Sequence, residues 1–176
     1  MRAHLRALEK NILKYRALQM VLLLHQTESL RSFLIGSIRY TDFIKNENRL
    51  PINVRGAMEK ALNIIVKDGI ISSTDRDDLQ SIIAMRNTIA HRIHELVVDI
   101  SASDGLSCCD SLYDYFALER FERYRHKISS GMTRNYALQI GLRELQFGLA
   151  EAAYKEELSR LRQRIDRQHG ARNASL

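Results

Sequence analysis

Proline and glycine are scarce in this sequence, with one proline and eight glycines among 176 residues. So few turn-forming residues exclude the frequent tight turns of a β-sandwich or β-barrel and favour helices. Cysteine is scarce too, because Cys108 and Cys109 have no third cysteine to pair with. Adjacent cysteines are poorly placed for an ordinary disulfide, so we interpret both as loop or helix-entry residues.

Long hydrophobic runs are also absent. The longest uninterrupted apolar run is Met20 to Leu24, whereas a transmembrane helix needs about 20 apolar residues. The stretch before this run carries Glu9, Lys10 and Lys14, a pattern typical of an amphipathic helix rather than a cleavable signal. We therefore expect no membrane segment and a cytoplasmic location.

Length and composition favour one globular domain. The chain is 45% hydrophobic and 27% charged, and folding of a chain this long removes roughly 70% of its unfolded surface from water. No repeat, low-complexity tract or composition break divides the sequence. We expect a single helical domain over residues 1–170 and a frayed tail over residues 171–176.

Positive charge exceeds negative charge, with 27 Lys and Arg against 21 Asp and Glu, a net charge of +6. Two stretches carry most of the excess, Arg120 to Arg134 and Arg160 to Arg172. Such an excess favours polyanionic partners through phosphate contacts and counterion release.

Apolar spacing of three and four residues predicts the first helices. One helix includes Leu5 to Leu22 and another begins near Ser29, with Thr27 to Ser29 either a break or only a bend. Lys45 to Pro51 is predicted to be a polar loop. Pro51 is expected at or just before the first turn of the next helix, which Gly69 ends.

The second half of the chain is predicted to hold three more helices. Ser73 or Thr74 caps a helix with an acidic start that runs to about Val98. The remaining boundaries are a loop at Ser101 to Ser107, a helix from Asp110 to about His126, a break at Ser129 to Gly131, and a last helix capped by Thr133 and ending near Gly170. The predicted fold is all-α, a compact bundle of five to six mostly antiparallel helices.

One arginine lies in the middle of an apolar helix face. At about 100° per residue, Arg86 falls within the sector formed by Leu79, Ile82, Ile83, Ile89, Ala90, Ile93 and Val97. A desolvated guanidinium needs a carboxylate, carbonyl or phosphate partner, so this sector is expected to open onto something polar. Asn87, His91 and His94 lie along one flank, with Asn87 and His91 spaced so that their side chains can meet.

Two interpretations of this set stay open. Arginine can lay its stem over an apolar face, and surface histidines often have no chemical role. In the other interpretation, a fixed positive charge, a titratable imidazole and an orienting amide suffice for acid/base cleavage of RNA without a metal. His91 and His94 could share a metal, but no carboxylate completes that site convincingly, so we expect no metal and no cofactor.

The segment from Arg86 to His91, RNTIAH, resembles the signature of the HEPN superfamily. Many members of that family are metal-independent ribonucleases, built as all-α bundles whose active site is completed by two motifs across a dimer interface. The resemblance implies Arg86 and His91 as the catalytic pair and Asn87 as the supporting polar residue. HEPN toxins paired with a nucleotidyltransferase antitoxin often carry a tyrosine two positions after the histidine, where this chain has Ile93.

We therefore expect a homodimeric endoribonuclease of HEPN type that leaves 2′,3′-cyclic phosphate ends. A toxin-antitoxin or antiviral setting is expected, with a cognate antitoxin or other inhibitory protein as a possible partner. The expected RNA-binding residues are Arg92, His94, Arg120 and Arg123.

The same stretch is also similar to one in mannitol-operon repressor-like proteins. That resemblance implies a non-catalytic helical regulator in which the arginine and histidine serve structure or binding. Because the sequence shows no separate DNA-binding module, such a regulator would act through protein contacts or the basic faces.

Overall fold

The computed structural model describes residues 6–91, 113–139 and 142–173. Within these residues the chain forms five helices and no strand. The helices are α1 (Ala7–Lys45), α2 (Ala57–Lys67), α3 (Ser73–His91), α4 (Ala117–Met132) and α5 (Leu142–Asn173). The predicted all-α bundle is confirmed. No helix in the described part of the chain has an apolar stretch that could span a membrane.

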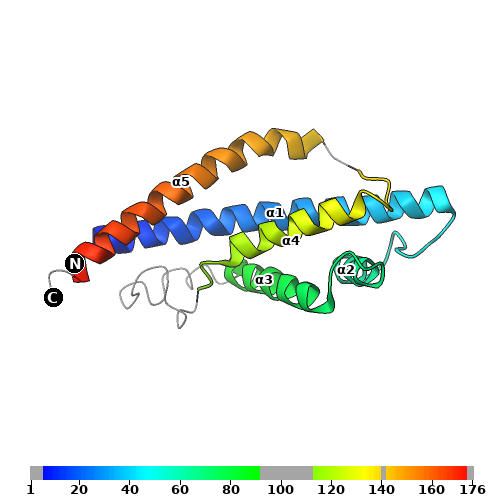
Figure 1. The fold of residues 1–176 in the computed structure, drawn as a ribbon, viewed down its shortest axis with the longest axis horizontal. Helices are drawn as coiled ribbons and strands as arrows, with labels where there is room; N and C mark the ends of the chain where they lie inside the picture. Colours follow the sequence, from blue (N-terminus) through cyan, green and yellow to red (C-terminus); the bar gives the residue numbers. More distant parts are fainter. Residues whose placement is uncertain (1–5, 92–112, 140–141, 174–176) are drawn as a thin grey trace.

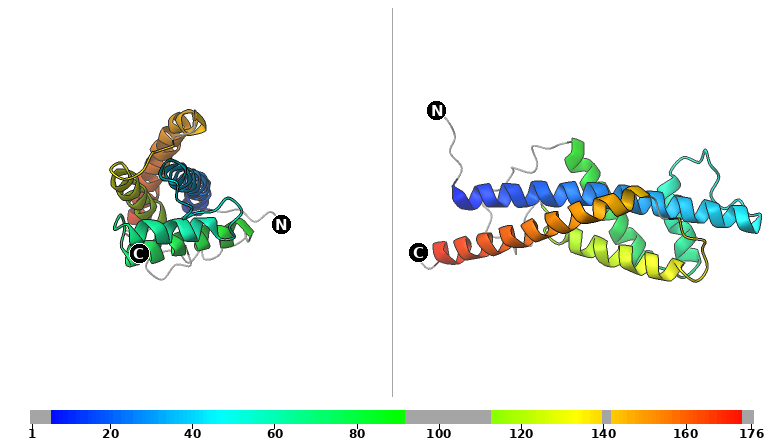
Figure 2. Two further views of the ribbon diagram at one scale, coloured as in Figure 1. Left: turned by 90° about the vertical axis from the view of Figure 1, so that its right-hand side faces the viewer. Right: turned by 90° about the horizontal axis from the view of Figure 1, so that it is seen from above.

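The helices are arranged in layers around α1, which runs along the length of the molecule (Figure 1). α5 covers one side, α4 lies beside α1, and α2 and α3 cover the opposite side (Figure 2). α1 and α5 are antiparallel, so the first turns of α1 and the last turns of α5 lie at the same end. One core joins the layers and includes the fully buried Ile12, Leu22, Leu62, Phe121 and Ile165.

α1 is a single helix of 39 residues, so the chain has no break at Thr27 to Ser29. Thr27 is buried, as are Leu23 and Leu30 one turn to either side. The apolar face therefore continues through the polar residues, and packing along it outweighs their weak helix propensity. α1 ends at Lys45 because Asn46 adopts the left-handed conformation, with φ of 55°.

The start of α2 is later than predicted, and its end is as predicted. α2 begins at Ala57, so Pro51 lies in the preceding loop rather than at the first helical turn. Arg39 holds this loop by donating hydrogen bonds to the backbone carbonyls of Leu50, Pro51 and Ile52. Gly69 follows α2 with φ of 72°, a conformation that glycine adopts without steric cost.

α3 is capped one residue earlier than predicted. The Ser72 hydroxyl accepts a hydrogen bond from the backbone N–H of Asp75, and the Asp75 carboxylate accepts one from the backbone N–H of Ser72. This reciprocal capping box needs a serine three residues before the acid, and only Ser72 stands there. The predicted caps Ser73 and Thr74 are therefore wrong.

The boundaries of the last two helices differ most from prediction. Asp110 lies outside the described residues, but residues 113–116 are non-helical and α4 begins at Ala117. The predicted break at Ser129 to Gly131 is wrong, because α4 continues to Met132 and buries Ile128 and Met132. Thr133 does not cap α5: its hydroxyl donates to the carbonyls of Ser129 and Ser130 at the end of α4. α5 ends at Asn173, three residues beyond Gly170.

Candidate functional site

Arg86 lies on α3 one turn after the buried Ile82, on the face that packs toward α1. Its side chain is 12% exposed. Nη2 of Arg86 lies 3.3 Å from Oε1 of Glu28 on α1, and Nη1 donates a hydrogen bond to Oδ1 of Asn87. Nε of Arg86 is buried and has no partner among the described residues.

The expected polar partner of Arg86 is therefore a carboxylate from another helix. The side chain of Glu28 is 52% exposed and also lies 3.5 Å from Arg31. Solvent thus reaches the carboxylate, while most of the Arg86 guanidinium is shielded. This arrangement holds a mostly shielded positive charge at the seam between α1 and α3.

His91 is the last residue of α3, five positions after Arg86 and four after Asn87. The backbone places it about one turn beyond the Arg86–Asn87 pair, but its side chain lies outside the described residues. Arg92 and His94 also lie outside them. The amide of Asn87, expected to orient an imidazole, is engaged with Arg86.

The two predicted RNA-binding residues on α4 differ in their surroundings. Arg120 lies between two carboxylates, with Nη1 3.3 Å from Asp78 and Nη2 bonded to Asp114. Its charge is therefore balanced within the protein. Arg123 is exposed, and its guanidinium carbon lies 5.7 Å from the centre of the Tyr124 ring. Asp78 stands eight residues before Arg86 on α3, a rise of roughly 12 Å.

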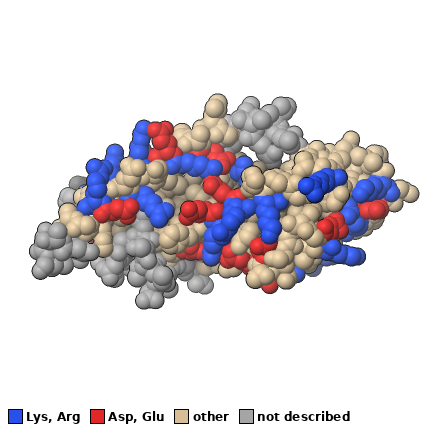
Figure 3. Space-filling view, viewed as in Figure 1, with Lys and Arg blue, Asp and Glu red and all other residues tan. Residues whose placement is uncertain are grey.

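The basic stretch of α4 is neutralised at other positions as well. Arg125 pairs with Glu151 of α5 at 3.3 Å, and Lys127 pairs with Asp75 of α3. Lys and Arg side chains accordingly lie next to Asp and Glu side chains over the middle of this face (Figure 3). The excess positive charge noted in the sequence is thus partly used in contacts between helices.

A charged network that the sequence did not predict joins α1, α4 and α5. Lys155 lies 2.7 Å from both Glu122 and Glu151, and Gln26 donates to Glu151 at 2.7 Å. Burial alone would raise the pKa of Glu151, but the hydrogen bond from Lys155 and the charge of Arg125 lower it. The network borders a cleft of about 240 Å³ whose floor includes the buried Tyr15, Gln19 and Tyr115. No local pattern indicates it, because its members come from three helices.

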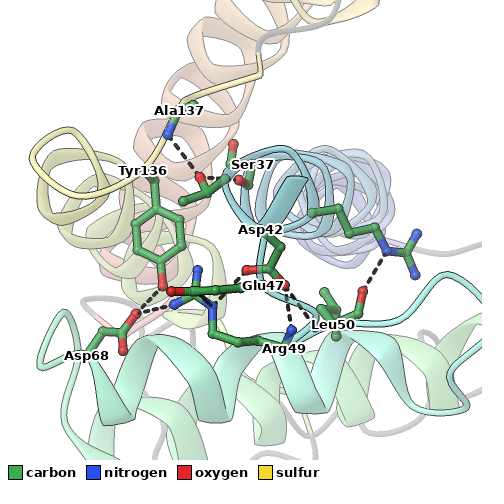
Figure 4. Close-up of polar contacts among 10 residues, drawn as sticks. Ser37, Asp42, Glu47, Arg49, Leu50, Asp68, Tyr136 and Ala137 are labelled. Atoms are coloured by element: carbon green, nitrogen blue, oxygen red, sulfur yellow. Dashed lines mark hydrogen bonds and ion pairs between the residues drawn. The ribbon is translucent and has the colours of Figure 1, made fainter. Parts of the chain in front are cut away.

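A second unpredicted cluster lies at the opposite end of α1 (Figure 4). The buried carboxylate of Asp42 accepts hydrogen bonds from the backbone N–H groups of Arg49 and Leu50 and from Nε of Arg49. Arg49 also reaches Asp68 at 3.2 Å, and Tyr136 donates its hydroxyl to Asp68. Burial and the neighbouring Asp68 raise the pKa of the Tyr136 phenol. These contacts fix the loop after α1 against α2 and the segment after α4.

The chain matches no known protein-family model, no curated protein and no solved structure at a significant level. Among the residues that the structure describes, no group of three or more His, Cys, Asp or Glu side chains is placed to hold a metal ion.

Proposed function

We propose that the chain is an endoribonuclease of HEPN type that cleaves RNA without a metal ion. The observation that carries the proposal is the position of Arg86, a mostly shielded guanidinium held at the α1–α3 seam by Glu28 and Asn87. His91 follows about one turn later on the same helix. In this proposal the RNTIAH segment, which resembles the HEPN signature, binds phosphate through the part of the Arg86 side chain that stays exposed.

In the proposed reaction, His91 takes the proton from the ribose 2′-hydroxyl or protonates the leaving 5′-oxygen. The 2′-oxygen attacks the adjacent phosphorus, the bond from phosphorus to the 5′-oxygen breaks, and the product ends in a 2′,3′-cyclic phosphate. Arg86 stabilises the charge that develops on the phosphoryl oxygens. Asn87 positions the guanidinium, because its side-chain oxygen accepts a hydrogen bond from Nη1.

The proposal includes a homodimer in which two copies of the motif meet, since each chain supplies one Arg86 and one His91. Exposed apolar side chains beside Glu28 support it: Val21 and Leu24 precede Glu28 by seven and four residues on α1. They are 47% and 46% exposed. A second copy covering this face of α1 would bring the two seams together. A toxin-antitoxin or antiviral role, with a cognate inhibitory protein, belongs to the same proposal.

The test is to incubate the purified protein with several classes of RNA in EDTA and map the ends of the products. We expect cleavage with 2′,3′-cyclic phosphate ends, abolished in His91→Ala and in Arg86→Ala. His126→Ala is the matched control, because this histidine is exposed on α4 away from the motif. If the wild-type protein cleaves no more RNA than His91→Ala does, the proposed nuclease activity is wrong. The Arg86–Glu28 pair is then a contact between helices in a non-catalytic regulator.

A further inference from the structure

The two ends of the described chain meet and are joined by a side-chain hydrogen bond. Nδ2 of Asn11 in the first turns of α1 donates to Oε1 of Gln168 in the last turns of α5, at 3.0 Å. Both side chains are half-buried, and they lie beside the apolar seam formed by Ile12, Leu161 and Ile165. This bond sets the position of α5 relative to α1, and so it determines which side chains of the two helices are neighbours beside the apolar seam.

On α1, two lysines flank this bond. At about 100° per residue, Lys14 lies about 60° and Lys10 about 100° around α1 from Asn11, and both lie about 100° or more from the buried Ile12 and Tyr15. Both lysines are exposed, and neither has an ion-pair partner among the described residues.

On α5, two arginines occupy the corresponding side. Arg164 and Arg167, together with Gln168 and Ala171, line a cleft of about 340 Å³. Both arginines are exposed, and no described carboxylate pairs with either of them. Arg120 on α4, by contrast, is held by two carboxylates. The positive charge at this end of the bundle is therefore available to an external anion.

Lys14, three residues after Asn11, lies on the same face of α1 as Glu28, the partner of Arg86. Lys14 and Glu28 are 14 residues apart, which is close to a whole number of turns and a rise of roughly 21 Å. The exposed Val21 and Leu24 lie between them. A second copy seated on those two residues would leave the cleft at the rim of the shared site.

We propose that this cleft, with Lys10 and Lys14 beside it, binds the phosphate backbone of single-stranded RNA that extends from Arg86. The identity of the ligand rests on the proposed function. Nε of Arg167 donates to the backbone carbonyl of Gln163, but no described carboxylate pairs with this arginine. Guanidinium groups bind phosphate oxygens through two parallel hydrogen bonds, and exposed cations without carboxylate partners release counterions when a polyanion binds. The cleft contributes affinity without reading sequence, because it contacts backbone rather than bases.

Binding of a fluorescent 2′-O-methyl oligouridine, which lacks the attacking hydroxyl, tests the cleft by anisotropy between 0.05 and 0.5 M salt. The variant is the double substitution Arg164→Gln and Arg167→Gln. The control is Lys60→Gln with Lys67→Gln, which removes the same charge from exposed positions of α2. Loss of two phosphate contacts is expected to weaken binding about 20-fold at 0.1 M salt and to reduce the salt slope by about 1.4.

Three results would overturn the cleft assignment. The first is unchanged oligouridine binding by the α5 variant. The second is an equal loss of affinity in the α2 control, which indicates general electrostatic attraction rather than a binding site. The third is polyglutamate competing with the oligouridine equally well per charge, which indicates an acidic protein segment as the ligand.

The two proposals, the RNA-binding cleft and the nuclease activity, can be contradicted independently. If the wild-type protein cleaves no RNA but the α5 variant binds the oligouridine more weakly as expected, the nuclease proposal is wrong and the cleft assignment holds. If the wild-type protein cleaves RNA but the α5 variant binds the oligouridine as tightly as wild type does, the cleft assignment is wrong and the nuclease proposal holds.

Discussion

Nη2 of Arg86 on α3 lies 3.3 Å from Oε1 of Glu28 on α1, and this contact joins two segments that are 58 residues apart. The arginine is mostly shielded, and the glutamate is half exposed. The pair therefore combines a desolvated cation with a carboxylate that water still reaches. This asymmetry decides what removal of either partner does.

Arg86→Ala is expected to lower the free energy of unfolding by only about 1 kcal/mol, because Glu28 returns to water instead of being left as a buried unpaired charge. Glu28→Ala is expected to cost more than this, because it leaves the mostly shielded Arg86 guanidinium without a carboxylate, and a double-mutant cycle should give a coupling of about 1 kcal/mol or less. Urea unfolding of the three variants measures both. The exposed i,i+4 pair Glu156–Arg160 on α5 is the reference. A loss of about 3 kcal/mol for Arg86→Ala would mean that a buried charge is stranded.

Val21→Glu is expected to dissociate the proposed homodimer, because it places a charge on the α1 face beside Glu28. Phe43→Glu is the matched control: Phe43 is 81% exposed near the other end of the same helix. Light scattering at micromolar concentration should show a dimer for wild type and Phe43→Glu and a monomer for Val21→Glu. A monomeric wild-type protein contradicts the proposed active site shared between two subunits. Dissociation by Phe43→Glu contradicts the proposed interface at Val21 and Leu24, because it indicates an interface near the C-terminal end of α1.

The sequence predicted the helix that carries the candidate site because the signals there are local. Gly69 ends α2, the acidic start favours α3, and the apolar spacing of Leu79 and Ile82 identifies the buried face. The partner of Arg86 was not predictable, because nothing near Glu28 in the sequence indicates which helix packs beside it. For the same reason Arg120 was predicted to bind RNA although two distant carboxylates balance its charge.

Local signals also produced the errors at the end of α4. Ser129, Ser130 and Gly131 are weak helix formers, and together they predicted a break. Burial of Ile128 and Met132 on the same helical face outweighs that preference. Such burial depends on how α4 packs against α1 and α3, and so it is a property of the assembled fold.

Asp75 makes the contact between α3 and α4 sensitive to acid. The hydrogen bond from Lys127 and that from the backbone of Ser72 lower the pKa of the Asp75 carboxyl to about 2. A depressed pKa in the folded state stabilises the protein above the unfolded value of about 4, and this stabilisation is lost as pH falls from about 4 to about 2.

Asp75→Asn is therefore expected to be less stable than wild type at neutral pH, with the difference disappearing as pH approaches 2. Urea unfolding at a series of pH values measures it. Asp166→Asn serves as the control, because Asp166 is exposed on α5 and has no ion-pair partner among the described residues. A difference for Asp75→Asn that stays constant from pH 7 to pH 2 contradicts the assignment.

Gly131 is required inside α4 because the helix passes close to Ile70. A methyl group at this glycine would come within 2.6 Å of Cγ2 of Ile70, a branched side chain that is itself buried. Gly131→Ala is therefore expected to destabilise the protein by about 1–3 kcal/mol, although alanine is the better helix former. Gly148→Ala on α5, where nothing lies within 4 Å, should instead stabilise by up to about 1 kcal/mol. Thermal or urea unfolding compares the two, and Ile70→Ala should reduce the cost of Gly131→Ala by removing the branched carbon. A stabilising Gly131→Ala would show that α4 and Ile70 are farther apart than this packing requires.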